Sequence, residues 1–187
     1  MFERGGFSTV NGNSTMMTRA ATVTLATFAA LAGTVVLQAQ NPMSTELKSA
    51  YAGIKTNVTK AAEKMPEDQY GFKASPDIRT FGALIGHIAD AQTSFCSTAA
   101  GAAKRGDAST KTTKADLVAA LKASFDVCDG VINSLTDADA TGMIAARGGQ
   151  RSKLSVLWTM VAHSNEEYGY LAVYMRIKGI VPPSTEP

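Results

Sequence analysis

The spacing of apolar residues between residues 44 and 178 constrains the fold of this chain more than any other feature. Apolar side chains recur every three or four positions in four separate stretches, which is the repeat of helices that each bury one face. The first stretch shows it most plainly, with Leu47, Tyr51, Ile54, Val58, Ala61 and Met65. No alternating pattern of useful length indicates a β-strand. The sequence therefore predicts an all-α fold.

Residues that begin or end helices divide this region into four helices. Their expected bounds, in chain order, are 44–65, 80–101, 113–135 and 152–178. Thr113 and Asp116 resemble a capping box at the start of the third helix, and Ser152 is suited to cap the fourth. Residues 136–151 are expected to be a loop with at most a short helical turn. Four helices in about 145 residues can enclose a core, so we expect a four-helix bundle.

The N-terminal region is expected to lie outside that bundle. Residues 20–37 are uncharged, follow Arg19 and precede Ala39, which is the layout of a secretory signal peptide cleaved near Ala39. Alanine and threonine dilute the stretch, which makes an uncleaved membrane anchor the weaker alternative. Met16 and Met17 are alternative start positions. We therefore expect a leader over 1–39, a bundle domain over 40–187, and an exported, periplasmic or secreted protein without stable membrane insertion after cleavage.

Charge and rare residues exclude several classes of function. The chain has 18 Lys and Arg against 16 Asp and Glu, a net charge of +2, which argues against a nucleic-acid partner. It contains no phosphate-binding glycine loop and no nucleophile elbow. With two histidines and two cysteines, one chain cannot build a three-histidine site or a four-cysteine zinc site.

The two histidines fall on the second and fourth expected helices. His163 and Glu167 are four residues apart and point to the same side of a helix, at the edge of its apolar face. His87 flanks the apolar face of the second helix. Two histidines and one carboxylate form a known arrangement for a divalent metal with open coordination positions. The alternative is two packed, hydrogen-bonded histidines and a solvated Glu167.

Two stretches resemble the DinB/YfiT-like family, and the similarity extends over most of the expected mature chain. They are residues 70–97, YGFKASPDIRTFGALIGHIADAQTSFCS, and the C-terminal WTMVAHSNEEYGYLAVYMRIKGIVPPST. The resemblance implies a four-helix bundle that holds a divalent metal with one histidine of the second helix and a His-x3-His pair of the fourth. His87 and His163 match two of these positions, whereas the third falls on Glu167. It therefore implies a Zn, Ni, Fe or Mn ion bound by His87, His163 and Glu167.

The resemblance also implies an up-down-down-up bundle with a crossover between the second and third helices. Residue counts support that topology. His87 lies 13 residues before Ala100, and Asn165 lies 13 residues beyond Ser152, so the three ligands are level if the second and fourth helices are antiparallel. In a parallel pair His87 would miss the other two by roughly 6 to 12 Å.

The same count bears on Cys96 and Cys128. They lie 16 and 15 residues beyond the expected starts of the second and third helices, hence nearly level in parallel helices. A disulfide is therefore one hypothesis, and an oxidising compartment would favour it. Two buried thiols are the preferred interpretation, because levelness alone does not meet the narrow geometric limits of a disulfide.

An open metal site suggests two kinds of chemistry. A bound divalent ion can lower the pKa of a water molecule, which suggests hydrolysis, or bind a thiolate, which suggests thiol transfer. We interpret the chain as an exported DinB-like metal-binding protein and a metal-dependent enzyme of one of these types, with a small-molecule substrate and a homodimeric state as further expectations. The alternative is a non-catalytic ligand-binding or stress-associated envelope protein that has lost the metal.

Overall fold

The computed structural model describes residue 5 and residues 41–187. The predicted signal peptide, with its cleavage position near Ala39, falls outside the described residues. Residues 41–187 form one compact unit. In that described part of the chain, no helix is long and apolar enough to cross a membrane.

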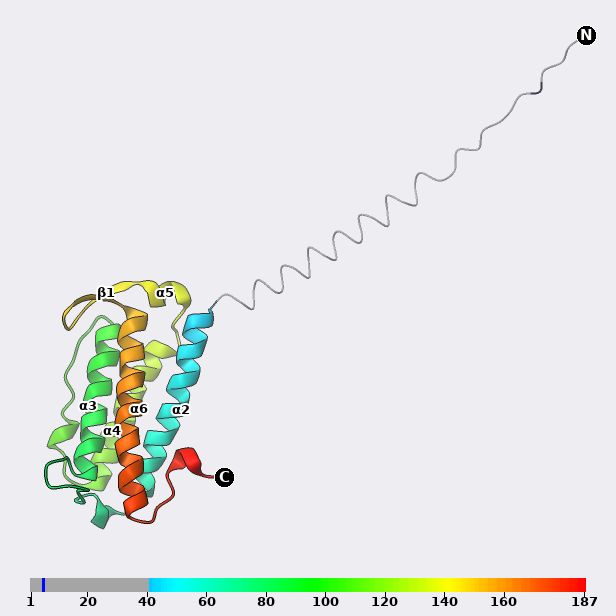
Figure 1. Cartoon of the computed structure of the whole chain (residues 1–187). Coiled ribbons are helices and arrows are strands. Elements are labelled where there is room, and N and C mark those ends of the chain that lie inside the picture. Colours follow the sequence, from blue (N-terminus) through cyan, green and yellow to red (C-terminus); the bar gives the residue numbers. More distant parts are fainter. Residues whose placement is uncertain (1–4, 6–40) are drawn as a thin grey trace, which may run out of the picture. The chain divides into compact units, whose positions relative to one another are not determined.

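Four long helices form the main part of the described unit (Figure 1). They are α2 (Pro42–Lys64), α3 (Phe81–Ala99), α4 (Lys114–Ile132) and α6 (Lys153–Ile177). The predicted mostly helical fold is confirmed, and the observed bounds lie within three residues of the expected ones. Thr80, Thr113 and Ser152 each accept a hydrogen bond from the backbone N–H three residues further on. These caps start α3, α4 and α6 because they satisfy backbone donors that the first helical turn leaves free.

Contacts at both ends of α2 show that it runs antiparallel to α4. Near its start, Lys48 Nζ donates a hydrogen bond to the Leu135 carbonyl just beyond the end of α4. Near its end, Lys114 Nζ at the start of α4 donates to the carbonyl of Met65. The side chains between these ends form a common core with α3 and α6.

The helices α3 and α4 run parallel. A Cβ atom on Gly82, at the start of α3, would lie 3.2 Å from Leu117 near the start of α4. Cys96 and Cys128, near the two helix ends, form a disulfide with a Cα–Cα distance of 5.0 Å. The segment 100–113 must therefore return along the length of the bundle, as Figure 1 shows.

The disulfide corrects the preferred interpretation of the two cysteines as free thiols. Cys96 and Cys128 are fully buried, and the Cys128 sulfur also contacts the Gln92 carbonyl at 3.7 Å. Residue counting placed the two cysteines level. Only the rotation of each helix about its own axis, which packing sets, decides that their side chains face each other.

The segment 136–152 contains structure that the sequence did not predict. It holds the short helix α5 (Asp137–Thr141) and an antiparallel hairpin of β1 (Met143–Ala146) and β2 (Gly149–Ser152). Each strand has four residues, which is too short for an alternating pattern to stand out. Gly148 and Gly149 adopt positive φ angles of 89° and 125° at the turn, where glycine carries no steric penalty.

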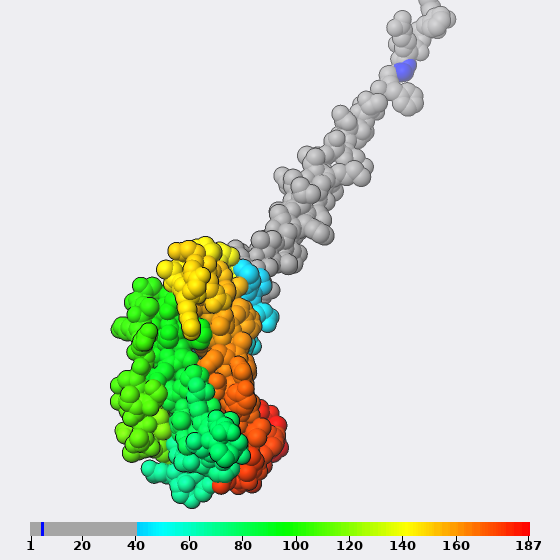
Figure 2. Space-filling model, turned by 60° about the vertical axis from the view of Figure 1, so that its left-hand side comes forward, coloured from blue at the N-terminus to red at the C-terminus, as the bar shows by residue number. Residues whose placement is uncertain are grey.

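These elements cover one end of the bundle, while residues 65–80 cover the opposite end (Figure 2). The Asp137 carboxylate accepts hydrogen bonds from the backbone N–H groups of Met43 and Ser44, and so ties α5 to the start of α2. Asp137 thus serves as a side-chain acceptor for the first turn of that helix.

A buried polar chain crosses the core between three helices. Ser124 Oγ on α4 donates to Gln92 Oε1 on α3 at 2.9 Å, and Gln92 Nε2 donates to Ser164 Oγ on α6 at 3.5 Å. All three residues are buried. Because a buried amide is costly unless both of its ends are paired, these contacts help to fix the relative positions of α3, α4 and α6.

Candidate metal centre

The structure brings together the three residues that the sequence singled out. His87 comes from α3, and His163 and Glu167 come from successive turns of α6. His87 Nε2 lies 3.1 Å from His163 Nε2 and 3.4 Å from Glu167 Oε1. His163 Nε2 lies 3.7 Å from Glu167 Oε1. Two imidazole nitrogens and one carboxylate oxygen therefore form a nearly equilateral triangle.

The size of this triangle suits a single divalent ion. Zinc binds histidine nitrogen and carboxylate oxygen at about 2.0–2.2 Å, and tetrahedral angles then separate neighbouring donor atoms by about 3.3 Å. The observed separations of 3.1, 3.4 and 3.7 Å bracket that value. An ion at the triangle would have three protein ligands and at least one open position.

Burial is unequal across the three side chains. The Glu167 side chain is only 7% exposed, whereas those of His87 and His163 are 33% and 23% exposed. The interpretation of Glu167 as a solvated helix residue is therefore wrong. The histidines form the side of the cluster that solvent reaches, and the carboxylate lies beneath them.

Two polar atoms of the cluster are buried without a hydrogen-bond partner among the described residues. They are Glu167 Oε2 and His163 Nδ1. A carboxylate out of water is costly unless a positive charge or hydrogen-bond donors offset the lost hydration. A divalent cation between Glu167 and the two imidazoles would supply that charge, so the donor set fits the metal that was predicted.

The electrostatic surroundings favour the metal-binding form of His163. Burial lowers the pKa of this imidazole, and the nearby His87 and Arg79 lower it further, while Glu167 acts in the opposite direction. The net effect lowers the pKa of His163 from its ordinary value. The ring is therefore neutral at pH 7, and a neutral ring offers the lone pair that a metal ligand needs.

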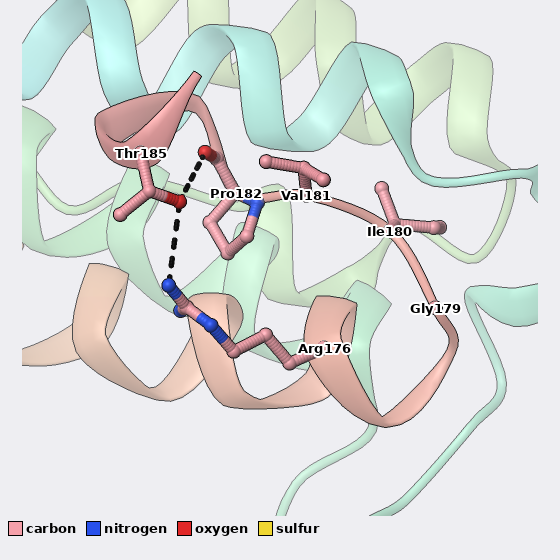
Figure 3. Close-up of a pocket in the computed structure, with 6 residues that line it drawn as sticks. All are labelled: Arg176, Gly179, Ile180, Val181, Pro182 and Thr185. Atoms are coloured by element: carbon pink, nitrogen blue, oxygen red, sulfur yellow. Dashed lines mark hydrogen bonds between the residues drawn. The ribbon is translucent and has the colours of Figure 1, made fainter. Parts of the chain in front are cut away.

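A different hollow lies near the C-terminal end of α6 and is not part of this cluster. Its volume is about 260 Å³, and Arg176, Val181 and Thr185 are among the residues that line it (Figure 3). The Arg176 guanidinium donates a hydrogen bond to Thr185 Oγ1. Arg176 lies nine residues beyond Glu167, which is about 13 Å along a helix. Its charged group is held by the C-terminal segment and does not face the metal centre.

Comparison with known proteins agrees with the fold. The family model of the DinB superfamily matches residues 51–171, a span that includes all three residues of the cluster. The chain belongs to the DinB superfamily. Among curated proteins, none matches the chain.

Two solved structures show the DinB-like fold. A DinB-like protein from Bacillus cereus is 19% identical, with a TM-score of 0.64 over 75% of this chain and 95% of that one. A DinB-like protein from Bacillus subtilis is 21% identical, with a TM-score of 0.58 over 72% of this chain and 92% of that one. At such low identity the likeness concerns the fold alone.

Sequence reasoning missed a second group of residues near the cluster. Asp77, Ile78, Arg79, Leu84, Tyr170 and Tyr174 line a cavity between the 70–80 segment and the helices α3 and α6. The sequence placed this segment only between two expected helices. No motif identified Arg79, because its place beside the cavity depends on how the segment packs against Tyr174.

Proposed function

We propose that this DinB superfamily protein binds one divalent metal ion through His87, His163 and Glu167 and uses it as an enzyme. The triangle of donor atoms, with separations of 3.1 to 3.7 Å and a buried carboxylate at one corner, is the observation that carries the proposal. Such a buried and incompletely paired charge costs stability in the absence of a cation. A functional site is a common reason for a protein to keep such a group.

The ligand set leaves the reaction class open between two types. When bound, a divalent ion with three protein ligands supplies an acid centre for a water molecule or for a thiolate. The part of this chain is to hold the donor atoms in place, keep His163 neutral and admit the reacting group from the exposed side of the imidazoles. Hydrolysis and thiol transfer of a small-molecule substrate are both consistent with that arrangement.

The donor atoms limit the choice of metal. Two imidazoles and one carboxylate suit Zn, Ni, Fe(II) and Mn, because imidazole accommodates the first three and carboxylate is favourable for manganese. The resemblance implies a third histidine where this chain has Glu167. The carboxylate of Glu167 adds a negative charge and is a harder ligand than an imidazole. We therefore expect affinities to differ from those of a three-histidine site.

Metal analysis of the chain, purified without a histidine tag, tests the proposal. The chain has only two histidines, so a purification tag without histidine leaves no other imidazole ligand. Dialysis against Zn, Ni, Mn and Fe(II) in turn, followed by elemental analysis, should give one bound ion per chain for at least one metal. The variants His87→Ala, His163→Ala and Glu167→Ala should lose it. Glu166→Ala, an exposed neighbour on the same helix, should retain it.

The absence of bound ion under all four conditions would contradict the metal centre. It would instead support the alternative, a non-catalytic ligand-binding or stress-associated envelope protein. That alternative is supported by one observation: Glu167 stands at the position where the resemblance implies a third histidine.

We also propose that the protein is exported and acts as a periplasmic or secreted domain after cleavage near Ala39. The buried Cys96–Cys128 disulfide supports this placement, because such bonds persist in oxidising compartments. Cell fractionation and N-terminal sequencing of the mature protein would test it. A homodimer remains a proposal, which light scattering of the purified chain would test.

A further inference from the structure

A cavity lies one helical turn from the metal centre. It has a volume of about 530 Å³, and its walls include Leu84 of α3 and Tyr170 and Tyr174 of α6. Leu84 precedes His87 by three residues, and Tyr170 follows Glu167 by three. At 1.5 Å per residue, these walls begin about 4.5 Å along each helix from the metal ligands. A small molecule in the cavity could therefore extend to the metal centre.

The Arg79 guanidinium lies at this cavity without a bound partner. Among residue 5 and residues 41–187, no carboxylate forms a salt bridge with Arg79, and its side chain makes no hydrogen bond. A guanidinium offers five N–H donors in a fork that matches a carboxylate.

The backbone at Arg79 is held firmly. The Tyr174 hydroxyl donates a hydrogen bond of 2.6 Å to the Arg79 carbonyl. The Tyr174 ring packs edge to face against Phe72, with ring centres 5.8 Å apart. The same tyrosine lines the cavity, so the wall of the cavity also fixes the position of the arginine.

The start of α3 adds positive potential but no free donors. The backbone N–H groups of Phe81 and Gly82 donate to the carbonyls of Phe72 and Tyr70, and that of Ala83 donates to the Thr80 hydroxyl. The first turn of α3 contains no acidic residue to offset the helix dipole. An anion in the cavity would thus be attracted by the helix end and bound by Arg79.

We propose that this cavity binds the carboxylate end of a small anionic substrate, with Arg79 as its partner, while the other end of the molecule reaches the metal centre. This inference rests on the proposed metal-dependent function and names the substrate class. Ile78, Leu84 and Tyr170 provide apolar walls for the body of the molecule. A body of about four to eight bonds, at roughly 1.3 Å per bond, spans the 4.5 to 10.5 Å that separate Glu167 from Tyr170 and Tyr174 along α6.

Asp77 also lines the cavity and carries the opposite charge. It is exposed, and among the salt bridges of the described residues none joins it to Arg79. Its carboxylate should weaken the binding of an anion, so the two residues should have opposite effects. This difference provides an internal control.

Cobalt(II)-loaded protein allows the inference to be tested by binding alone. The probe is 4-mercaptobutanoate, whose sulfur can bind the metal, and the matched neutral probe is 4-mercaptobutanamide. The sulfur-to-cobalt absorption band gives a Kd for each. We expect the wild type to bind the acid about fivefold to tenfold more tightly than the amide, in line with an exposed, charge-assisted pair. Arg79→Gln should bring this ratio close to one, whereas Asp77→Asn should keep or increase it.

The outcomes separate this inference from the proposed function. An acid-to-amide ratio in Arg79→Gln equal to that of the wild type overturns the carboxylate subsite and leaves the metal centre intact. An acid-to-amide ratio that falls as far in Asp77→Asn as in Arg79→Gln also overturns it. General damage to the 70–80 segment would then be the cause. A wild type that acquires neither the visible absorption of bound cobalt(II) nor any of Zn, Ni, Mn and Fe(II) in the elemental analysis sinks the proposed function and this inference together.

Discussion

Glu167 should make the metal-free protein less stable than it could otherwise be. Its carboxylate is buried, and Oε2 has no partner among the described residues. Glu167→Gln keeps the shape of the side chain and removes the charge. At pH 8 the neighbouring His163, whose pKa is lowered by burial, carries little charge to offset the carboxylate. We therefore expect the metal-free variant to be more stable than the metal-free wild type.

The size of the effect follows from the cost of an unpaired buried group. One unsatisfied buried polar atom costs about 1–3 kcal/mol, and more when it is charged. The amide keeps one imperfectly paired atom, so we expect a net gain of about 1–2 kcal/mol. In a domain of this size that gain corresponds to an increase in Tm of about 3–8 °C.

Bound metal should make the wild type more stable than Glu167→Gln, which reverses the order expected without metal. An ion at 100 times its Kd adds about 2.7 kcal/mol to the stability of the protein that binds it. The wild type should gain this increment, whereas the variant, which has lost its charged ligand, should gain much less. Thermal unfolding followed by circular dichroism, with chelator and then with zinc, measures both quantities.

The exposed residue Glu166 supplies the matched control. Glu166→Gln should change the free energy of unfolding by no more than about 0.5 kcal/mol, with or without metal. If Glu167→Gln lowers the stability of the metal-free protein and leaves the response to zinc unchanged, Glu167 is a structural residue and the reasoning is refuted.

Three further changes test the fold around the site. Replacing Cys96 and Cys128 by serine opens a loop with a sequence separation of 32, and the chain-entropy relation predicts a loss of about 3.7 kcal/mol in urea unfolding. Burial raises the pKa of Asp129, but the hydrogen bonds from Lys55 and Tyr51 and the charge of Lys55 outweigh this effect, so the pKa lies below its ordinary value of 3.8. Its contribution to stability is therefore present above pH 3.8 and lost as the pH falls through its folded-state pKa, so the stability difference between wild type and Asp129→Asn should shrink in acid; a constant difference would contradict this. Ser152→Ala removes the cap of α6 and should cost about 1 kcal/mol in the same unfolding assay, whereas an unchanged midpoint would show that the cap is dispensable.

The bundle could be predicted from the sequence because helix formation follows local patterns. The apolar repeat identified α2, α3, α4 and α6, and Thr80, Thr113 and Ser152 marked three of their starts. The hairpin of β1 and β2 could not be predicted in this way. Its strands are four residues long, and pairing with each other stabilises them more than any pattern in either strand.

The candidate site was predictable in part. His163 and Glu167 share a side of one helix by their spacing, which is a local property. Their approach to His87 depends on the direction and rotation of α3 against α6. Residue counting gave only the positions of the three residues along the length of the bundle. Arg79 was not predictable, because it lies in an irregular segment whose course follows its contacts with Tyr174.

The sequence by itself determined a helical domain with two histidines and one glutamate on the faces of two helices. It did so because periodicity, capping and spacing depend only on neighbouring residues. The tertiary structure decided that their three donor atoms converge, that Glu167 is buried, that Cys96 and Cys128 form a disulfide, and that Arg79 lines a cavity beside them. Each of these depends on which helix faces meet, and the packing of the whole bundle sets that.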